Sequence, residues 1–188
     1  MRAVVGLGNP GPKYAATRHN LGFWVLNRLL AQGEWQAKRF PWGEVFQWGE
    51  ALLLRPLTFM NLSGQAVAEL LRRFPLSTQD LLVVYDDVDL PLGEVRLRPR
   101  GGAGSHRGMQ SVLLALGRED VPRLRVGIGP APPEQDLAEF VLSPPRPEEL
   151  PLLERACDRA AALARLFLDR GLQAALDAYS RNSPAPSV

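Results

Sequence analysis

The sequence predicts one α/β domain, a three-layer globule with a mixed, twisted central sheet flanked by helices. Short apolar strands alternate with amphipathic helices along most of the 188 residues, a length that suits a single domain. The run Leu81–Val84 is continuously apolar, as in a strand buried on both faces of a parallel sheet. The segment 36–54 alternates and contains two glycines, which indicates antiparallel strands and therefore a mixed sheet.

Each element is expected from its own pattern of apolar residues. We expect strands at 2–5, 36–50 (strand, turn, strand), 51–54, 80–85, 94–100 and 124–128. We expect one helix to begin near Asn20, a good cap residue, and to stop at Gly33. We expect further helices at 65–74, 109–116, 150–168 and 172–179. The domain then covers 1–181, with C-terminal helices at 150–179 and a disordered tail at 182–188. The proline-rich segment 130–149 is either a mobile lid or a surface connection.

The composition is that of an ordinary globular protein, with 46% hydrophobic and 22% charged residues. No apolar run approaches the roughly 20 residues of a membrane span. Arg2 leads directly into the first strand, so we expect no signal peptide and no membrane contact. The single cysteine, Cys157, excludes an internal disulfide and fits a reducing cytoplasm. A net charge of only +2 does not by itself indicate a nucleic-acid partner.

The loop after the first strand holds His19, one of two histidines in the chain. An imidazole titrates near neutral pH, which makes it a natural general base. A lone loop histidine is most often simply exposed, but the polar neighbours Asn9, Tyr14 and Asn20 favour a functional role. Asp86 follows the buried strand, where it can hold one imidazole nitrogen and fix the tautomer. The alternative is that Asp86 is only a turn residue.

Other chemistries are weakly supported. The loop matches G-x-G-x-x-G at Gly6, Gly8 and Gly11, but two prolines interrupt it and the helical pattern waits until Asn20, which disfavours a dinucleotide site. No serine stands in a G-x-S-x-G elbow. Two histidines and one cysteine do not make an ordinary zinc site. We therefore expect no cofactor and no metal, and direct attack by an activated water.

Two residues close to position 60 each allow a structural and a functional interpretation. Asn61 either caps the following helix or faces a ligand. Phe59 either packs in the core or stacks on a base.

Arginines recur with the period of a strand. Arg96, Arg98 and Arg100 share one face of a predicted strand, and Arg123 and Arg125 repeat the spacing. They are either ordinary exposed charges or a platform for phosphates.

Five blocks of sequence, in order, resemble the bacterial peptidyl-tRNA hydrolase family. They are Val5–Gly11 with Tyr14 and Thr17–Asn20, then Thr58–Gly64, Asp86–Gly93, Gly101–Gly108 and Leu124–Gly129. The resemblance spans nearly the whole chain. It implies a metal-free α/β globule, usually monomeric and without an obligatory protein partner. It also implies hydrolysis of the ester between a peptide and the 3′ ribose of tRNA, which frees tRNA stranded when ribosomes drop their peptide.

The resemblance also implies roles for matching residues. His19 corresponds to the general base and Asp86 to its orienting partner. The remaining positions correspond to binding of the peptide, the 3′ CCA end or the acceptor stem: Asn9, Tyr14, Phe59, Asn61, His106, Arg107, Arg98 and Arg125.

The chain departs from the family pattern at one position. The family usually has His-Asn-Gly where this chain has His106-Arg107-Gly108. An arginine cannot accept a hydrogen bond, so Arg107 cannot replace both functions of an amide. Either Arg107 supplies charge to an oxyanion or a phosphate, or another group positions the water. The alternative function is RNA binding without catalysis, as in plant-organelle relatives that serve in intron splicing.

Overall fold

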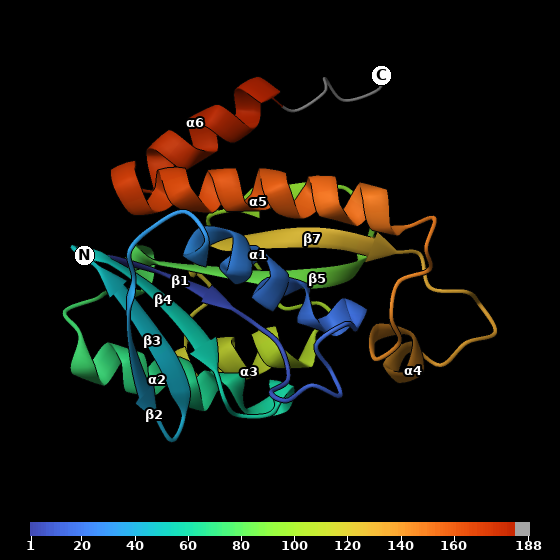
Figure 1. Ribbon diagram of the computed structural model, residues 1–188, viewed down its shortest axis with the longest axis horizontal. Coiled ribbons are helices and arrows are strands. Elements are labelled where there is room, and N and C mark those ends of the chain that lie inside the picture. The colour runs from blue at the N-terminus through green and yellow to red at the C-terminus, as the bar shows by residue number, and fades with distance from the viewer. Residues whose placement is uncertain (183–188) are drawn as a thin grey trace.

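The computed structural model describes residues 1–182, which form one seven-stranded sheet between two layers of helices (Figure 1). The strand order is β2-β3-β4-β1-β5-β7-β6. The strands are β1 (Arg2–Gly6), β2 (Gln36–Phe40), β3 (Gly43–Trp48), β4 (Ala51–Pro56), β5 (Leu81–Pro91), β6 (Val95–Arg98) and β7 (Arg123–Gly129). The four central strands are parallel, while β3 and β6 run antiparallel to their neighbours. The mixed sheet confirms the prediction.

The helices bury the two faces of this sheet against separate apolar cores. On one face lie α1 (Leu21–Leu30) and α5 (Leu150–Arg170), with α6 (Leu172–Asn182) outside α5 (Figure 1). On the other face lie α2 (Ser63–Arg73) and α3 (Arg107–Leu116). The short α4 (Leu137–Val141) and three single turns, η1 (Arg18–Asn20), η2 (Met60–Leu62) and η3 (Thr78–Asp80), complete the described elements. The three-layer prediction is confirmed.

Glycines let α1 approach the sheet very closely. A Cβ on Gly22 would lie 2.5 Å from the backbone nitrogen of Leu7 and 2.6 Å from the carbonyl oxygen of Val84. A Cβ on Gly6 would lie 2.4 Å from the carbonyl oxygen of Gly22. Gly6 therefore serves helix packing and not a phosphate-binding turn, since α1 begins only at Leu21. Because η1 leads directly into α1, this packing brings His19 against β5 and its Asp86.

Strand β5 is longer than the sequence predicts. The expected strand ends at Tyr85, whereas β5 continues to Pro91 and contains Asp86. Its ladder with β7 holds through Asp87 and then shifts register before Pro91. Pairing with β7 extends the strand through Asp86 and Asp87. Beyond them the backbone N–H of Asp89 donates to Oδ1 of Asp87 at 2.8 Å, the local bond typical of a turn aspartate.

Helix α2 differs from the prediction at both ends. It begins at Ser63, and neither Asn61 nor Ser63 caps it, because the Ser63 hydroxyl donates to the carbonyl oxygen of Met60 at 2.7 Å. The helix ends at Arg73, and Phe74 is extended because the next residue, Pro75, disfavours a helical conformation before it. The Asn61 side chain is therefore free of a capping role.

The C-terminal region follows the prediction closely. Gly171, with a φ of 93°, ends α5, and α6 continues to Asn182, the first residue of the predicted tail. The remainder of that tail, 183–188, lies outside the described residues. Among residues 1–182, no helix is long and apolar enough to cross a membrane.

Candidate active site

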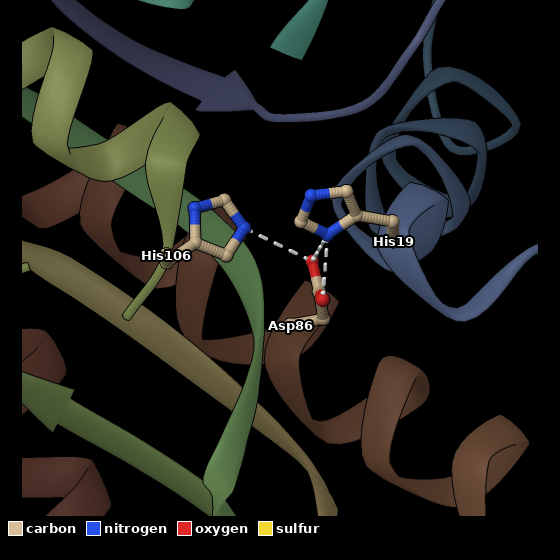
Figure 2. Close-up of side chains that lie close together, drawn as sticks. All are labelled: His19, Asp86 and His106. Carbon is tan, nitrogen blue, oxygen red and sulfur yellow. Dashed lines mark hydrogen bonds and ion pairs between the residues drawn. The ribbon is translucent and has the colours of Figure 1, made fainter. Parts of the chain in front are cut away.

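Two histidines from different elements converge on the carboxylate of Asp86 (Figure 2). His19, in η1, places its Nδ1 at 2.8 Å from Oδ2 and 3.1 Å from Oδ1. His106, the residue before α3, places its Nε2 at 3.1 Å from Oδ1. Asp86 is 1% exposed, and the two imidazole rings lie 4.8 Å apart between centroids. The three residues form one hydrogen-bonded chain.

The hydrogen bonds define which ring nitrogens carry protons. A carboxylate only accepts, so Nδ1 of His19 donates to Asp86 and its Nε2 is left as the basic nitrogen. Nδ1 of His106 accepts the backbone N–H of Met109 at 3.0 Å, so its Nε2 donates to Asp86. His106 is therefore held as a neutral donor, and His19 is the ring with a free basic nitrogen.

The charges of this group shift its acid–base equilibria. Burial lowers the pKa of His19, but the adjacent Asp86 carboxylate outweighs it through charge and hydrogen bonding, so the pKa rises above its ordinary value. Burial by itself raises the pKa of Asp86, but His19 and His106 together hold it well below the usual carboxyl range. Asp86 therefore stays ionised at neutral pH and supports a protonated His19.

A cavity of about 430 Å³ opens at this group. Seven residues predicted as site residues line it: Asn9, His19, Phe59, Asn61, Asp86, His106 and Arg107. Residues of α4 and its flanks, among them Leu137 and Val141, form another part of its lining. Phe59 is 57% exposed, so it is a surface of the cavity and not a core residue. Helix α4 falls within the segment predicted to be a lid or a connection.

The amide of Asn9 is oriented by its surroundings. Its Oδ1 accepts the backbone N–H of Met60 at 2.8 Å, which leaves the NH₂ group as the side chain's donor. The side chain of Asn20 holds the Asn9 backbone on both sides, accepting from its N–H and donating to its carbonyl, each at 2.9 Å. Asn20 occupies the N-cap position of α1 as predicted, but its side chain braces the loop and makes no capping bond to the helix.

Three predicted site residues lie outside the lining of this cavity, as far as residues 1–182 define it: Tyr14, Arg98 and Arg125. Arg125 pairs with Asp87 at 2.6 Å on the sheet beside Asp86. Arg98 is exposed on β6, and its Nη1 lies 3.5 Å from the hydroxyl of Tyr179. The expected repetition of exposed arginines fails at Arg123, which is buried and donates to backbone carbonyls of the neighbouring loops.

Other chemistries fit this site poorly. The side chains of His19, Asp86 and His106 offer ligand atoms within 4.8 Å of one another, a spacing that a metal could use. However, Nδ1 of His19 and Nε2 of His106 each carry a proton and donate it to the Asp86 carboxylate. The three side chains are therefore arranged as a hydrogen-bonded chain. Burial raises the pKa of Cys157 to about 12, which removes it as a nucleophile.

A buried arginine next to His19 holds the 140–149 segment. Arg18 is 4% exposed, and its guanidinium pairs with Glu149 at 2.8 Å and donates to the Ser143 hydroxyl at 2.5 Å. It also donates to the carbonyl oxygen of Phe140 at 3.1 Å and lies over that ring. Glu149 is itself buried and also accepts from Arg146 at 2.9 Å. The turn that carries His19 is thus tied to the end of α4.

Comparison with known proteins identifies the family. The family model described as peptidyl-tRNA hydrolase matches residues 3–186. A peptidyl-tRNA hydrolase of Pseudothermotoga lettingae is 43% identical, over 96% of this chain and 97% of the relative. One of Synechococcus sp. is 45% identical, over 96% of this chain and 83% of the relative. A crystal structure of peptidyl-tRNA hydrolase from Acinetobacter baumannii superposes with a TM-score of 0.89 and 30% identity, covering 98% and 97% of the two chains.

The chain belongs to the peptidyl-tRNA hydrolase family. Within the described part of this family member, sequence reasoning missed three features of the site. The bond from His106 to Asp86 was not expected, since His106 was assigned to substrate. Asn20 was expected as a cap, and the pair of Arg18 with Glu149 gave no local signal because 131 residues separate the two.

Replacement of Arg18 by Met is expected to lower the free energy of unfolding by about 3 kcal/mol, measured by urea denaturation. This loss of stability is at the low end of the range expected when one partner of a buried ion pair is removed, because Arg146 still pairs with Glu149. The matched control is Arg28→Met, whose partners Glu154 and Asp158 are 54% and 71% exposed, with a loss under about 1 kcal/mol. Equal losses in the two variants would contradict a special role for Arg18.

Proposed function

We propose that this protein hydrolyses the ester bond between a peptide and the 3′ ribose of peptidyl-tRNA, with His19 as general base and Asp86 as its orienting partner. Membership of the family makes the chain a hydrolase whose substrate is peptidyl-tRNA. One observation carries the mechanism. The Nδ1 of His19 is held by a buried carboxylate while its Nε2 is basic, as in other hydrolases that use a base supported by aspartate.

The reaction follows from that geometry. Nε2 of His19 takes a proton from a water as the water oxygen attacks the ester carbonyl carbon. Asp86 stabilises the resulting imidazolium. The tetrahedral intermediate then breaks its bond to the ribose oxygen, which receives the proton from His19. The peptide carboxylic acid so released loses its proton to solvent, which leaves a peptide carboxylate and a tRNA with a free 3′ hydroxyl.

Residues around the cavity bind the two parts of the substrate. The free NH₂ group of Asn9 and the amide of Asn61 hold the peptide and the terminal adenosine of the CCA end. The exposed ring of Phe59 stacks on a base. Within residues 1–182 the Arg107 side chain forms no hydrogen bond or ion pair, and its charge favours a developing oxyanion or the nearest phosphate.

The rest of the tRNA lies along the arginine-bearing edge of the sheet. Arg98 and Arg125 contact phosphates of the acceptor stem, with Arg125 oriented by Asp87. The protein acts as a monomer in the cytoplasm and returns tRNA to use after ribosomes drop unfinished peptides. Tyr14 contacts substrate only if the loop around it moves, because it lies outside the cavity lining in this structure.

The pH dependence tests the pairing of His19 with Asp86. The base acts only when unprotonated, so its raised pKa places the acid limb of the kcat/KM profile above the roughly 6.5 of an ordinary histidine. Asp86→Asn removes the charge that raises this pKa, so the limb moves to lower pH while kcat falls steeply. An unaltered profile and kcat would sink the proposal. Asp80→Asn, at an exposed turn, is the control.

Salt dependence tests the acceptor-stem contacts. The double variant Arg98→Ala/Arg125→Ala is expected to weaken tRNA binding and to make the plot of log affinity against log salt shallower, by about one to two in slope. The control pair Arg155→Ala/Arg165→Ala removes two arginines of helix α5 that lie outside both the cavity and the arginine-bearing strands. Identical slopes for wild type and the β6–β7 variant would place the tRNA elsewhere.

A further inference from the structure

A second hollow continues from the active-site cavity along the helices of one face. It runs between α2 and α3, which lie side by side beneath the sheet (Figure 1). We call it the α2–α3 groove, and it is bounded by Trp42, Leu62, Gln65, Glu69, Arg72, Gln110 and Leu114. Four residues line both the groove and the cavity: Asn61, Ser105, Arg107 and Leu137. The groove is therefore an extension of the active site.

The groove is nearly neutral, and exposed leucines stand among the polar side chains that line it. Leu114 is 85% exposed although it belongs to a helix that packs on the sheet, and Leu62 and Leu137 are 41% and 39% exposed. Among the charged residues that line it, Glu69 and Arg72 pair with each other at 2.6 Å. Exposed leucines gathered along one hollow are typical of a binding surface for apolar groups.

We propose that the α2–α3 groove binds the peptide part of the substrate beyond the residue attached to the ester, with a preference for apolar side chains. The inference rests on the function proposed above. The ester lies at His19, so a substrate leaves the cavity in two directions, as RNA and as peptide. The groove is the continuation that shares four lining residues with the cavity.

The charge of the groove favours the peptide over the RNA. A tRNA end carries one negative charge per nucleotide and requires cations along its path. Among the described residues that line the groove, Arg107 is the one unpaired cation, and it lies at the junction with the cavity. Peptide backbone is neutral, and its apolar side chains gain free energy from contact with leucines. The exposed Gln65 supplies hydrogen bonds for peptide amides without choosing a sequence.

The length of the peptide decides whether the groove is used. Leu114 follows Arg107 by seven residues on α3, about 10 Å along the helix axis. An extended peptide advances by about 3.4 Å per residue, so it covers that span in about three residues beyond the cavity. The groove therefore distinguishes a long peptide from a single blocked amino acid. It adds affinity for ground state and transition state alike, which lowers KM more than it raises kcat.

The test compares two substrates on one tRNA, N-acetyl-leucyl-tRNA and N-acetyl-trileucyl-tRNA. For the wild type, kcat/KM is expected to be about tenfold higher for the trileucyl substrate, mostly through KM. Leu114→Glu is expected to reduce this preference by about threefold or more. The loss is smaller than the roughly tenfold or greater loss for a contact in a closed pocket, because the groove is open to solvent. The matched control is Leu152→Glu on α5, where the leucine is 40% exposed and outside the groove, and the preference is retained.

The outcomes separate the two claims. Hydrolysis of the N-acetyl-leucyl substrate by the wild type reports on the proposed function alone, and its absence overturns that function and this inference together. Hydrolysis of both substrates at equal kcat/KM overturns the groove and leaves the function standing. The groove proposal is also overturned if Leu114→Glu and Leu152→Glu lose the preference for the trileucyl substrate equally, or if neither variant loses it. Retained thermal unfolding midpoints check that both variants are folded.

Discussion

The carboxylate of Asp86 is 1% exposed and is shared by two imidazole rings. A buried carboxylate destabilises a fold unless its oxygens are hydrogen-bonded, so the structure depends on both rings reaching it. One ring comes from η1, next to α1 on one face of the sheet, and the other from the start of α3 on the opposite face. The same constraint joins the two helical layers at the central strand β5 and orients the base.

Each histidine is in turn held by its own surroundings. The N–H of Met109 fixes the tautomer of His106, so this ring satisfies Asp86 without competing for the role of base. On the other side, Arg18 anchors the turn of His19 to the segment that carries α4. A mobile base would lose the alignment that general-base catalysis requires. The wall of the cavity and the base are therefore fixed by one network.

The sequence predicts the layers, the mixed sheet and most elements, because burial on one face imposes a period that is visible locally. It also leads to His19 and Asp86, since few residue types perform base chemistry and strand ends are where ligands bind. The predicted end of β5, at Tyr85, was wrong because pairing with β7 overrides the turn preference of Asp86 and Asp87. The pair of Arg18 with Glu149 was missed because contacts between residues far apart in sequence leave no periodic pattern.

The central claim is that His19 activates water while other groups hold the substrate. Its most direct test is a comparison of wild type and His19→Ala on N-blocked and unblocked aminoacyl-tRNA, with a chelator present and with binding measured separately. The account predicts that wild type cleaves the blocked substrate despite the chelator, and that His19→Ala binds it with similar affinity but does not turn it over. Near-wild-type turnover by His19→Ala would contradict the account.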